Sequence, residues 1–286
     1  MRNRNYLLNI IGIRLFSRKN ILLMLLLYCL IKIHLNPIVS FSVISKCKIS
    51  PWIYPLLISD ANFLMLFAGG IIWFYSDIPF NHIWNSYIVL RLGREKWLIK
   101  QLIYIIVSAF IIPLEVIGLT WIAIFPRMEF QHDWGKIIYT LANTSVGSQF
   151  SLLWGISPQH IEKYNASEAM LMGILISGLG IAFMGILMFT ICLIGGRVSG
   201  LISGSLLVAF SSVAANVIIP QQQLFHMLSP VSYMRVGRIG VSIGGYQVMP
   251  SIIYIVWVYT IGIIICSFIG YLRIKRMNLE WKREKE

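Results

Sequence analysis

Long apolar runs separated by short polar passages make up most of the chain. The runs approach or exceed the roughly 20 helical residues that cross the hydrocarbon of a bilayer. The sequence therefore predicts an all-α integral membrane protein, with one transmembrane domain over residues 1–286. We expect six spans, at about Asn20–Leu35, Trp52–Tyr75, Trp97–Phe125, Ala169–Ile194, Ser199–Ile219 and Pro250–Leu272.

Two stretches depart from this simple pattern. Asn36 and Pro37 bend or end the first span, and apolar residues as far as Ile44 would extend it past a kink. The loop 126–167 holds a moderately apolar stretch, Ile137–Ile156, which Asn, Thr, Ser and Gln residues interrupt. We expect interfacial or re-entrant structure there and not a seventh span.

A tight helical hairpin is predicted between the fourth and fifth spans, because only Gly195 to Val198 separate them. Both spans are rich in small residues. Gly200 and Gly204 have the four-residue spacing that lets two helix backbones approach closely. We therefore expect these two glycines at a helix–helix contact.

Composition and charge agree with a membrane protein. Hydrophobic residues make up 57% of the 286 residues and charged residues only 12%, which is too much apolar surface for one soluble core. The net charge of +13 does not indicate nucleic acid, because most of the Lys and Arg residues lie on one side of the six spans. That side holds the N-terminal segment, residues 91–100, Arg197 and the tail 273–286, so both termini are expected in the cytoplasm.

The segment before the first span, residues 1–19, mixes apolar and basic residues. Tyr6, Leu7 and Ile10 recur among Arg4 and Arg14, the pattern of a basic amphipathic helix on the inner membrane surface. An ordinary juxtamembrane tail is the alternative interpretation.

Catalytic and metal-binding patterns are not found. The five histidines are scattered without ligand spacing, the four cysteines form no pair or metal spacing, and no phosphate-binding Gly-rich loop ends in Lys and Ser or Thr. We predict that the chain is not an enzyme and holds no cofactor or metal.

Two acids within apolar runs are candidate functional groups. Asp60 in the second span and Glu115 in the third lie at similar predicted depth and would face one cavity, with Lys32 and His34 as candidate partners. The alternative, which we favour, is that these groups hydrogen-bond between helices and set their packing.

The longest polar passage on the cytoplasmic side, residues 76–100, predicts a short helix and a basic turn. Pro79 suits a first helical turn, and Gly93 a stop. A solvated basic loop at lipid headgroups is the simpler interpretation. Contact with another protein is the one that the rest of the chain favours.

This layout resembles the membrane subunit of ATP-binding-cassette exporters of the type-2 permease class. The resemblance covers essentially the whole chain, although its motifs are not specific. It rests on the basic segment before the first span, the cytoplasmic helix before residues 91–96, and the very short turn 195–198. It also rests on residues 228–233, which resemble the family's Pro-aromatic turn before the last span.

The resemblance implies that residues 76–100 hold a coupling helix that docks on a separate ATPase chain, which binds ATP and Mg²⁺. It implies a re-entrant external segment within 216–249, a second permease copy or a related permease as partner, and a bacterial plasma membrane as location. Apolar spans rich in aromatic residues and Met suit a hydrophobic or amphipathic peptide or lipid-like cargo. The coupling residues would be an apolar anchor of Ile83, Trp84, Tyr87 and Ile88, and a charged rim of Arg91, Arg94, Glu95 and Lys96.

Two other functions remain open at this point. The loop 126–167 is longer than in the simplest members of that family, so an immunity or sensory protein that binds a toxin or partner there is one alternative. A proton-coupled secondary transporter that uses Asp60 and Glu115 is the other, although the two halves of the chain show no convincing repeat.

Overall fold

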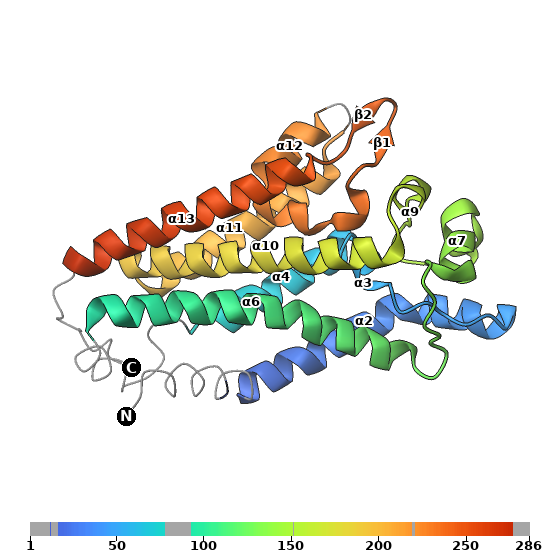
Figure 1. Cartoon of the computed structure of the whole chain (residues 1–286), viewed down its shortest axis with the longest axis horizontal. Coiled ribbons are helices and arrows are strands. Elements are labelled where there is room, and N and C mark those ends of the chain that lie inside the picture. The colour runs from blue at the N-terminus through green and yellow to red at the C-terminus, as the bar shows by residue number, and fades with distance from the viewer. Residues whose placement is uncertain (1–11, 13–16, 78–92, 151, 219–220, 277–286) are drawn as a thin grey trace.

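The computed structural model describes residues 12, 17–77, 93–150, 152–218 and 221–276, and it shows an elongated bundle of long helices (Figure 1). In these residues five helices are long and apolar enough to cross a membrane, which makes the chain a multi-pass membrane protein by helix length and hydropathy. They are α2 (Arg18–Ser45), α6 (Arg94–Ile124), α10 (Ala166–Gly195), α11 (Arg197–Asn216) and α13 (Ile252–Arg276).

Helix α10 is the centre of the bundle. It packs along α6, α11 and α13, and its buried residues include Ile181, Met184 and Ile186. A capping box begins it, in which the Asn165 side chain accepts a hydrogen bond from the backbone of Glu168, and the Asn165 backbone N–H donates to the Glu168 carboxylate over 3.2 Å. The glycines described below let its neighbours come close.

Helix α2 resolves the ambiguity at the end of the first span. It begins where the Ser17 side chain accepts a hydrogen bond from Asn20 N, and it continues past Pro37 to Ser45. It ends at Lys46, which takes a left-handed backbone conformation with φ of 54°. The extension past the proline is therefore the correct interpretation.

The predicted second span, Trp52–Tyr75, is not one helix. It forms α3 (Tyr54–Leu57) and α4 (Ala61–Tyr75), with Ile58, Ser59 and Asp60 between them. The carboxylate of Asp60 accepts a hydrogen bond from Phe63 N over 2.7 Å and so caps α4 in place of continuing the helix. The prediction of a continuous span was wrong for this reason, and α4 with 15 residues is shorter than the roughly 20 needed to cross hydrocarbon.

The predicted hairpin between the fourth and fifth spans is present. Gly196 alone separates α10 from α11, and its φ of 89° is a conformation that other residues rarely adopt. The last span is longer than expected, because Arg273 to Arg276 continue α13 where the sequence predicted the start of a tail.

Short elements fill the end of the bundle opposite this hairpin. The loop 126–167 forms α7 (Gly135–Asn143), α8 (Val146–Gln149) and α9 (Pro158–Lys163), so the stretch Ile137–Ile156 is not a span, as predicted. The loop 216–249 forms α12 (Gln222–Leu228), the 3₁₀ helices η1 (Pro230–Met234) and η2 (Val236–Arg238), and the two-stranded hairpin β1 (Ser242–Ile243) and β2 (Tyr246–Gln247).

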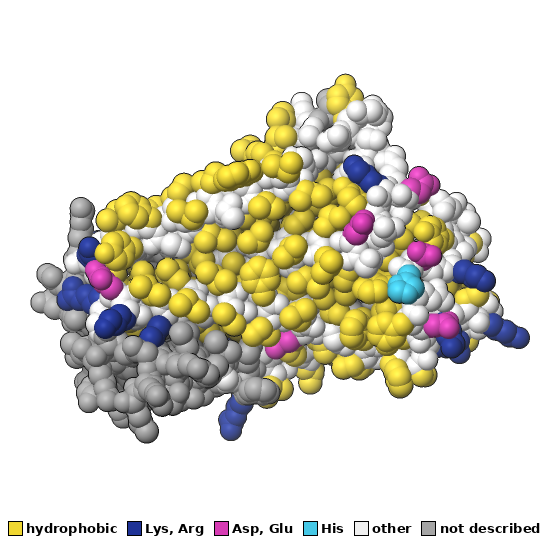
Figure 2. Space-filling view, viewed as in Figure 1, with side chains coloured by type: hydrophobic (Ala, Val, Ile, Leu, Met, Phe, Trp, Pro, Cys, Tyr) yellow, Lys and Arg dark blue, Asp and Glu magenta, His cyan; other side chains and the backbone are white. Residues whose placement is uncertain are grey.

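Apolar residues cover the middle of the bundle, and charged residues lie toward its two ends. Figure 2 shows hydrophobic side chains over the middle of this face and charged ones toward both ends. We call the end where α6 and α11 begin and α4 and α13 finish the basic end, and the opposite one the loop end. Of the segments predicted at the basic end, most of the N-terminal helix 1–19, most of the coupling passage and the tail beyond residue 276 lie outside the described residues.

Candidate functional site

The break between α3 and α4 is held by the loop before the last span. The guanidinium of Arg235 donates from Nε to the carbonyl oxygen of Ser59 over 2.9 Å. The Ser59 hydroxyl donates to Pro55 O over 2.6 Å and accepts from Gly237 N over 2.5 Å. Backbone groups that leave a helix in a membrane need partners within the protein. Here the side chains of Arg235 and Ser59 supply these hydrogen-bond partners. Their bonds connect the break between α3 and α4 to η2.

Charged groups surround this break. His34 on α2 places Nε2 3.7 Å from the carboxylate of Asp60, while its Nδ1 lies 2.9 Å from Leu30 O. Arg235 is only 7% exposed, and its Nη1 has no hydrogen-bond partner among the described residues. Burial, together with the neighbouring Arg238, lowers the pKa of Arg235 to about 10 although Asp60 opposes that shift. Asp60 is therefore the counter-charge of a buried cationic loop.

A second histidine belongs to the same loop. His226 on α12 is completely buried, and neither ring nitrogen has a partner among the described residues. Burial, reinforced by the charges of Arg235 and Arg238, lowers its pKa to about 4. The imidazole is thus neutral at physiological pH.

The structure brings together only part of the predicted group of intramembrane polar residues. His34 lies beside Asp60, whereas Lys32 donates to Ala123 O over 3.1 Å and lies 5.8 Å from the ring centre of Tyr28. Oε2 of Glu115 is buried with no hydrogen-bond partner among the described residues. The cluster that forms contains Arg235 in place of Lys32 and Glu115. Nothing in the sequence indicated that Arg235 would lie near Asp60, because the two residues are far apart along the chain.

The predicted coupling residues are only partly visible. Ile83, Trp84, Tyr87, Ile88 and Arg91 lie outside the described residues. Arg94, Glu95 and Lys96 form the first turn of α6 after Gly93. The carboxylate of Glu95 accepts a hydrogen bond from Tyr271 OH over 3.2 Å and lies 3.7 Å from Lys275 Nζ, so this turn is tied to the end of α13.

Gly200 and Gly204 lie where α11 approaches its neighbours most closely. A Cβ atom on Gly200 would stand 2.9 Å from the backbone oxygen of Met188 on α10. On Gly204 it would stand 2.9 Å from the Met188 sulfur and 3.1 Å from Ile72 on α4. Any larger side chain at either position would separate these helices.

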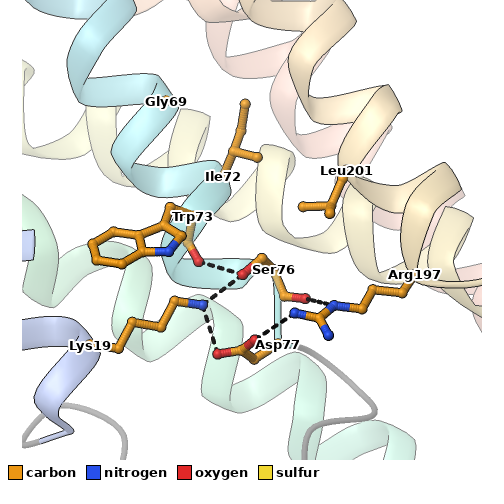
Figure 3. Close-up of a pocket in the computed structure, with 8 residues that line it drawn as sticks. All are labelled: Lys19, Gly69, Ile72, Trp73, Ser76, Asp77, Arg197 and Leu201. Carbon is orange, nitrogen blue, oxygen red and sulfur yellow. Dashed lines mark hydrogen bonds and ion pairs between the residues drawn. The ribbon is translucent and has the colours of Figure 1, made fainter. Parts of the chain in front are cut away.

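A groove at the basic end was not predicted from the sequence. It has a volume of about 580 Å³ and is lined by residues of α2, α4 and α11 (Figure 3). Lys19 and Arg197 both contact Asp77, which follows α4. The sequence gave one weak signal, an acid directly after an apolar run that ends on the side rich in Lys and Arg.

Metal binding has no support in the described ranges, where no group of three or more His, Cys, Asp or Glu side chains could hold an ion. No family model matches the chain, and no curated protein or solved structure shows significant similarity to it. What the helices establish is a multi-span membrane protein.

Proposed function

We propose that the chain is the membrane subunit of an ATP-driven exporter, resembling the type-2 permeases, and that it forms half of a translocation pathway. In this proposal α3 and α4 together make the interrupted second of six spans. ATP and Mg²⁺ bind a separate ATPase chain. A second copy or a related permease completes the pathway.

The proposed orientation follows from the basic end. Lys19, Arg94, Lys96, Arg197 and Lys275 belong to helix ends that meet there, and positively charged loops stay in the cytoplasm. Both termini are then cytoplasmic, in the plasma membrane of a bacterium. The loop end, with residues 126–167 and 216–249, faces outward.

One observation supports coupling more than any other. The polar passage 76–100 leaves α4 and enters α6 at the basic end, and Glu95 at its described end contacts Tyr271 and Lys275 of α13. A force on the passage would therefore reach two long helices together. ATP-driven closure of the ATPase pair would push on it and rock the spans between two arrangements.

The outer loop supports the same proposal. The segment η1 carries Tyr233 and Met234, both completely buried, and packs against α10 and α11. This packing supports the interpretation, implied by the resemblance, of an external segment that re-enters the bundle and caps the pathway. The apolar spans suit a hydrophobic or amphipathic peptide or a lipid-like cargo.

The deciding experiment is copurification of the full chain in mild detergent, with identification of bound proteins and an ATPase assay. We expect an ATPase to copurify, and Trp84→Ala and Tyr87→Asp in the proposed anchor to reduce its recovery at least tenfold. Tyr246→Asp is the matched control, because Tyr246 is 56% exposed at the loop end. Absence of a nucleotide-binding partner, or equal recovery with all three variants, would contradict the proposal.

A further inference from the structure

Two cations share one carboxylate in the groove at the basic end (Figure 3). Lys19 Nζ lies 2.7 Å from Asp77 Oδ2, and Arg197 Nη2 lies 3.1 Å from Asp77 Oδ1. Lys19 also donates to Ser76 Oγ over 2.6 Å, and Arg197 Nε donates to Ser76 O over 3.1 Å. The three side chains carry a net charge of +1, which favours an anion beside the two cations.

The cations are accessible to a ligand. The Arg197 side chain is 52% exposed, and its hydrogen bonds to Ser76 and Asp77 use Nε and Nη2. Lys19 lies 5.6 Å from the ring centre of Trp73, which is itself 36% exposed. A lysine beside a half-exposed indole is an arrangement typical of the headgroup region of a membrane.

The rest of the groove is apolar and leads away from these charges along the helices. It is lined by Gly69 and Ile72 of α4 and by Leu201 of α11 (Figure 3). A Cβ atom on Gly69 would meet no atom within 4 Å, so open space lies over this glycine. A ligand that fits the whole groove needs an anionic end and a hydrocarbon part.

We propose that this groove binds an anionic phospholipid, with its phosphate between Lys19 and Arg197 and an acyl chain along Gly69, Ile72 and Leu201. A soluble anion would use only the charged part. A zwitterionic lipid would bring a second cation to a place that already has an excess of positive charge. The lipid would join α2, α4 and α11, which the ion pairs of Asp77 already link. This inference does not depend on an ATPase partner.

The test is native mass spectrometry of the full chain, titrated in a neutral detergent with phosphatidylglycerol or phosphatidylcholine. We expect phosphatidylglycerol to be retained preferentially. Arg197→Gln should weaken its binding about fivefold, since a cation near a membrane surface contributes about that factor to the attraction of an anionic lipid.

A second variant protects the test against misfolding of the first. Gly69→Phe should fill the acyl groove, reduce phosphatidylglycerol retention and leave the Asp77 ion pairs intact. Gly118→Phe on α6 is the matched control, because a Cβ atom there also meets nothing within 4 Å. Equal retention of the two lipids, equal retention by Gly69→Phe and Gly118→Phe, or displacement of the lipid by millimolar inorganic phosphate would overturn the proposal.

Discussion

Helices α10 and α13 are similar in hydropathy and differ in burial. In the most apolar 18-residue stretch of each helix, 72% of the residues of α10 are buried but only 11% of those of α13. Lipid tails are as apolar as Leu, so hydropathy alone does not draw two helices together, whereas small residues that permit close packing do. Gly173, Gly178, Gly180 and Gly185 give α10 that property along its length.

The outer side of α13 shows the opposite character. Trp257, Ile264 and Phe268 are 62%, 67% and 59% exposed, at spacings that place them along one side of the helix. Large side chains there prevent close approach and suit contact with lipid. The size of the side chains therefore explains why α10 lies at the centre of this bundle and α13 at its outside.

The largest expected effect is at Gly185 in α10. A Cβ atom there would lie 2.7 Å from Ile105 Cγ2 and 3.0 Å from the ring of Tyr75. Gly185→Leu should therefore lower the free energy of unfolding by about 2–3 kcal/mol through overpacking. Tryptophan fluorescence during heating in detergent measures this. Gly118→Leu on α6, in open space, is the control, and an equal loss in both variants would show that close approach does not hold α10.

A smaller effect is expected from pH, through His226 on α12, which packs against α11 and η1. The pKa of His226 is about 4 in the folded protein against an ordinary 6.5, so its stabilising contribution is complete above pH 6.5 and is lost as the pH falls toward 4. Between pH 7 and pH 5.5 this costs about 1 kcal/mol. Unfolding curves at the two values measure it.

The variant His226→Gln should unfold with a weaker dependence on pH over that interval. His132→Gln is its control, because His132 is exposed. If both variants keep the pH dependence of the parent protein, His226 is not the group that causes it.

The smallest effect concerns the buried edge of α13. Tyr259 donates a hydrogen bond to Pro230 O over 2.6 Å and is completely buried. Tyr259→Phe should cost about 0.6 kcal/mol, the mean for such bonds between helices in membranes. Thermal unfolding of Tyr259→Phe, compared with that of Trp257→Phe on the exposed side of α13, measures the difference. If Tyr259→Phe lowers the free energy of unfolding more than Gly185→Leu does, the contact of α13 contributes more to stability than the close packing of α10.

Much of the fold was predictable because length and apolar character define a span within a few residues. The boundaries of α6, α10 and α11 follow the predicted runs closely. The break at Ser59 and Asp60 was not predictable, because apolar residues lie on both sides and Asp60 reads equally well as an intramembrane acid.

The candidate sites were harder to predict than the spans. The partner of Ser59 at the break, Arg235, is 176 residues further along the chain, and no local pattern joins them. The groove likewise gathers residues of three helices around Asp77. Spans are local properties of a sequence, whereas these clusters depend on which helices become neighbours.

The single glycine between α10 and α11 has a mechanical consequence. With one residue as linker, the adjoining ends of α10 and α11 must stay together in any rearrangement of the bundle. Sliding of α10 along α11 is therefore limited at the end of the bundle where this glycine lies.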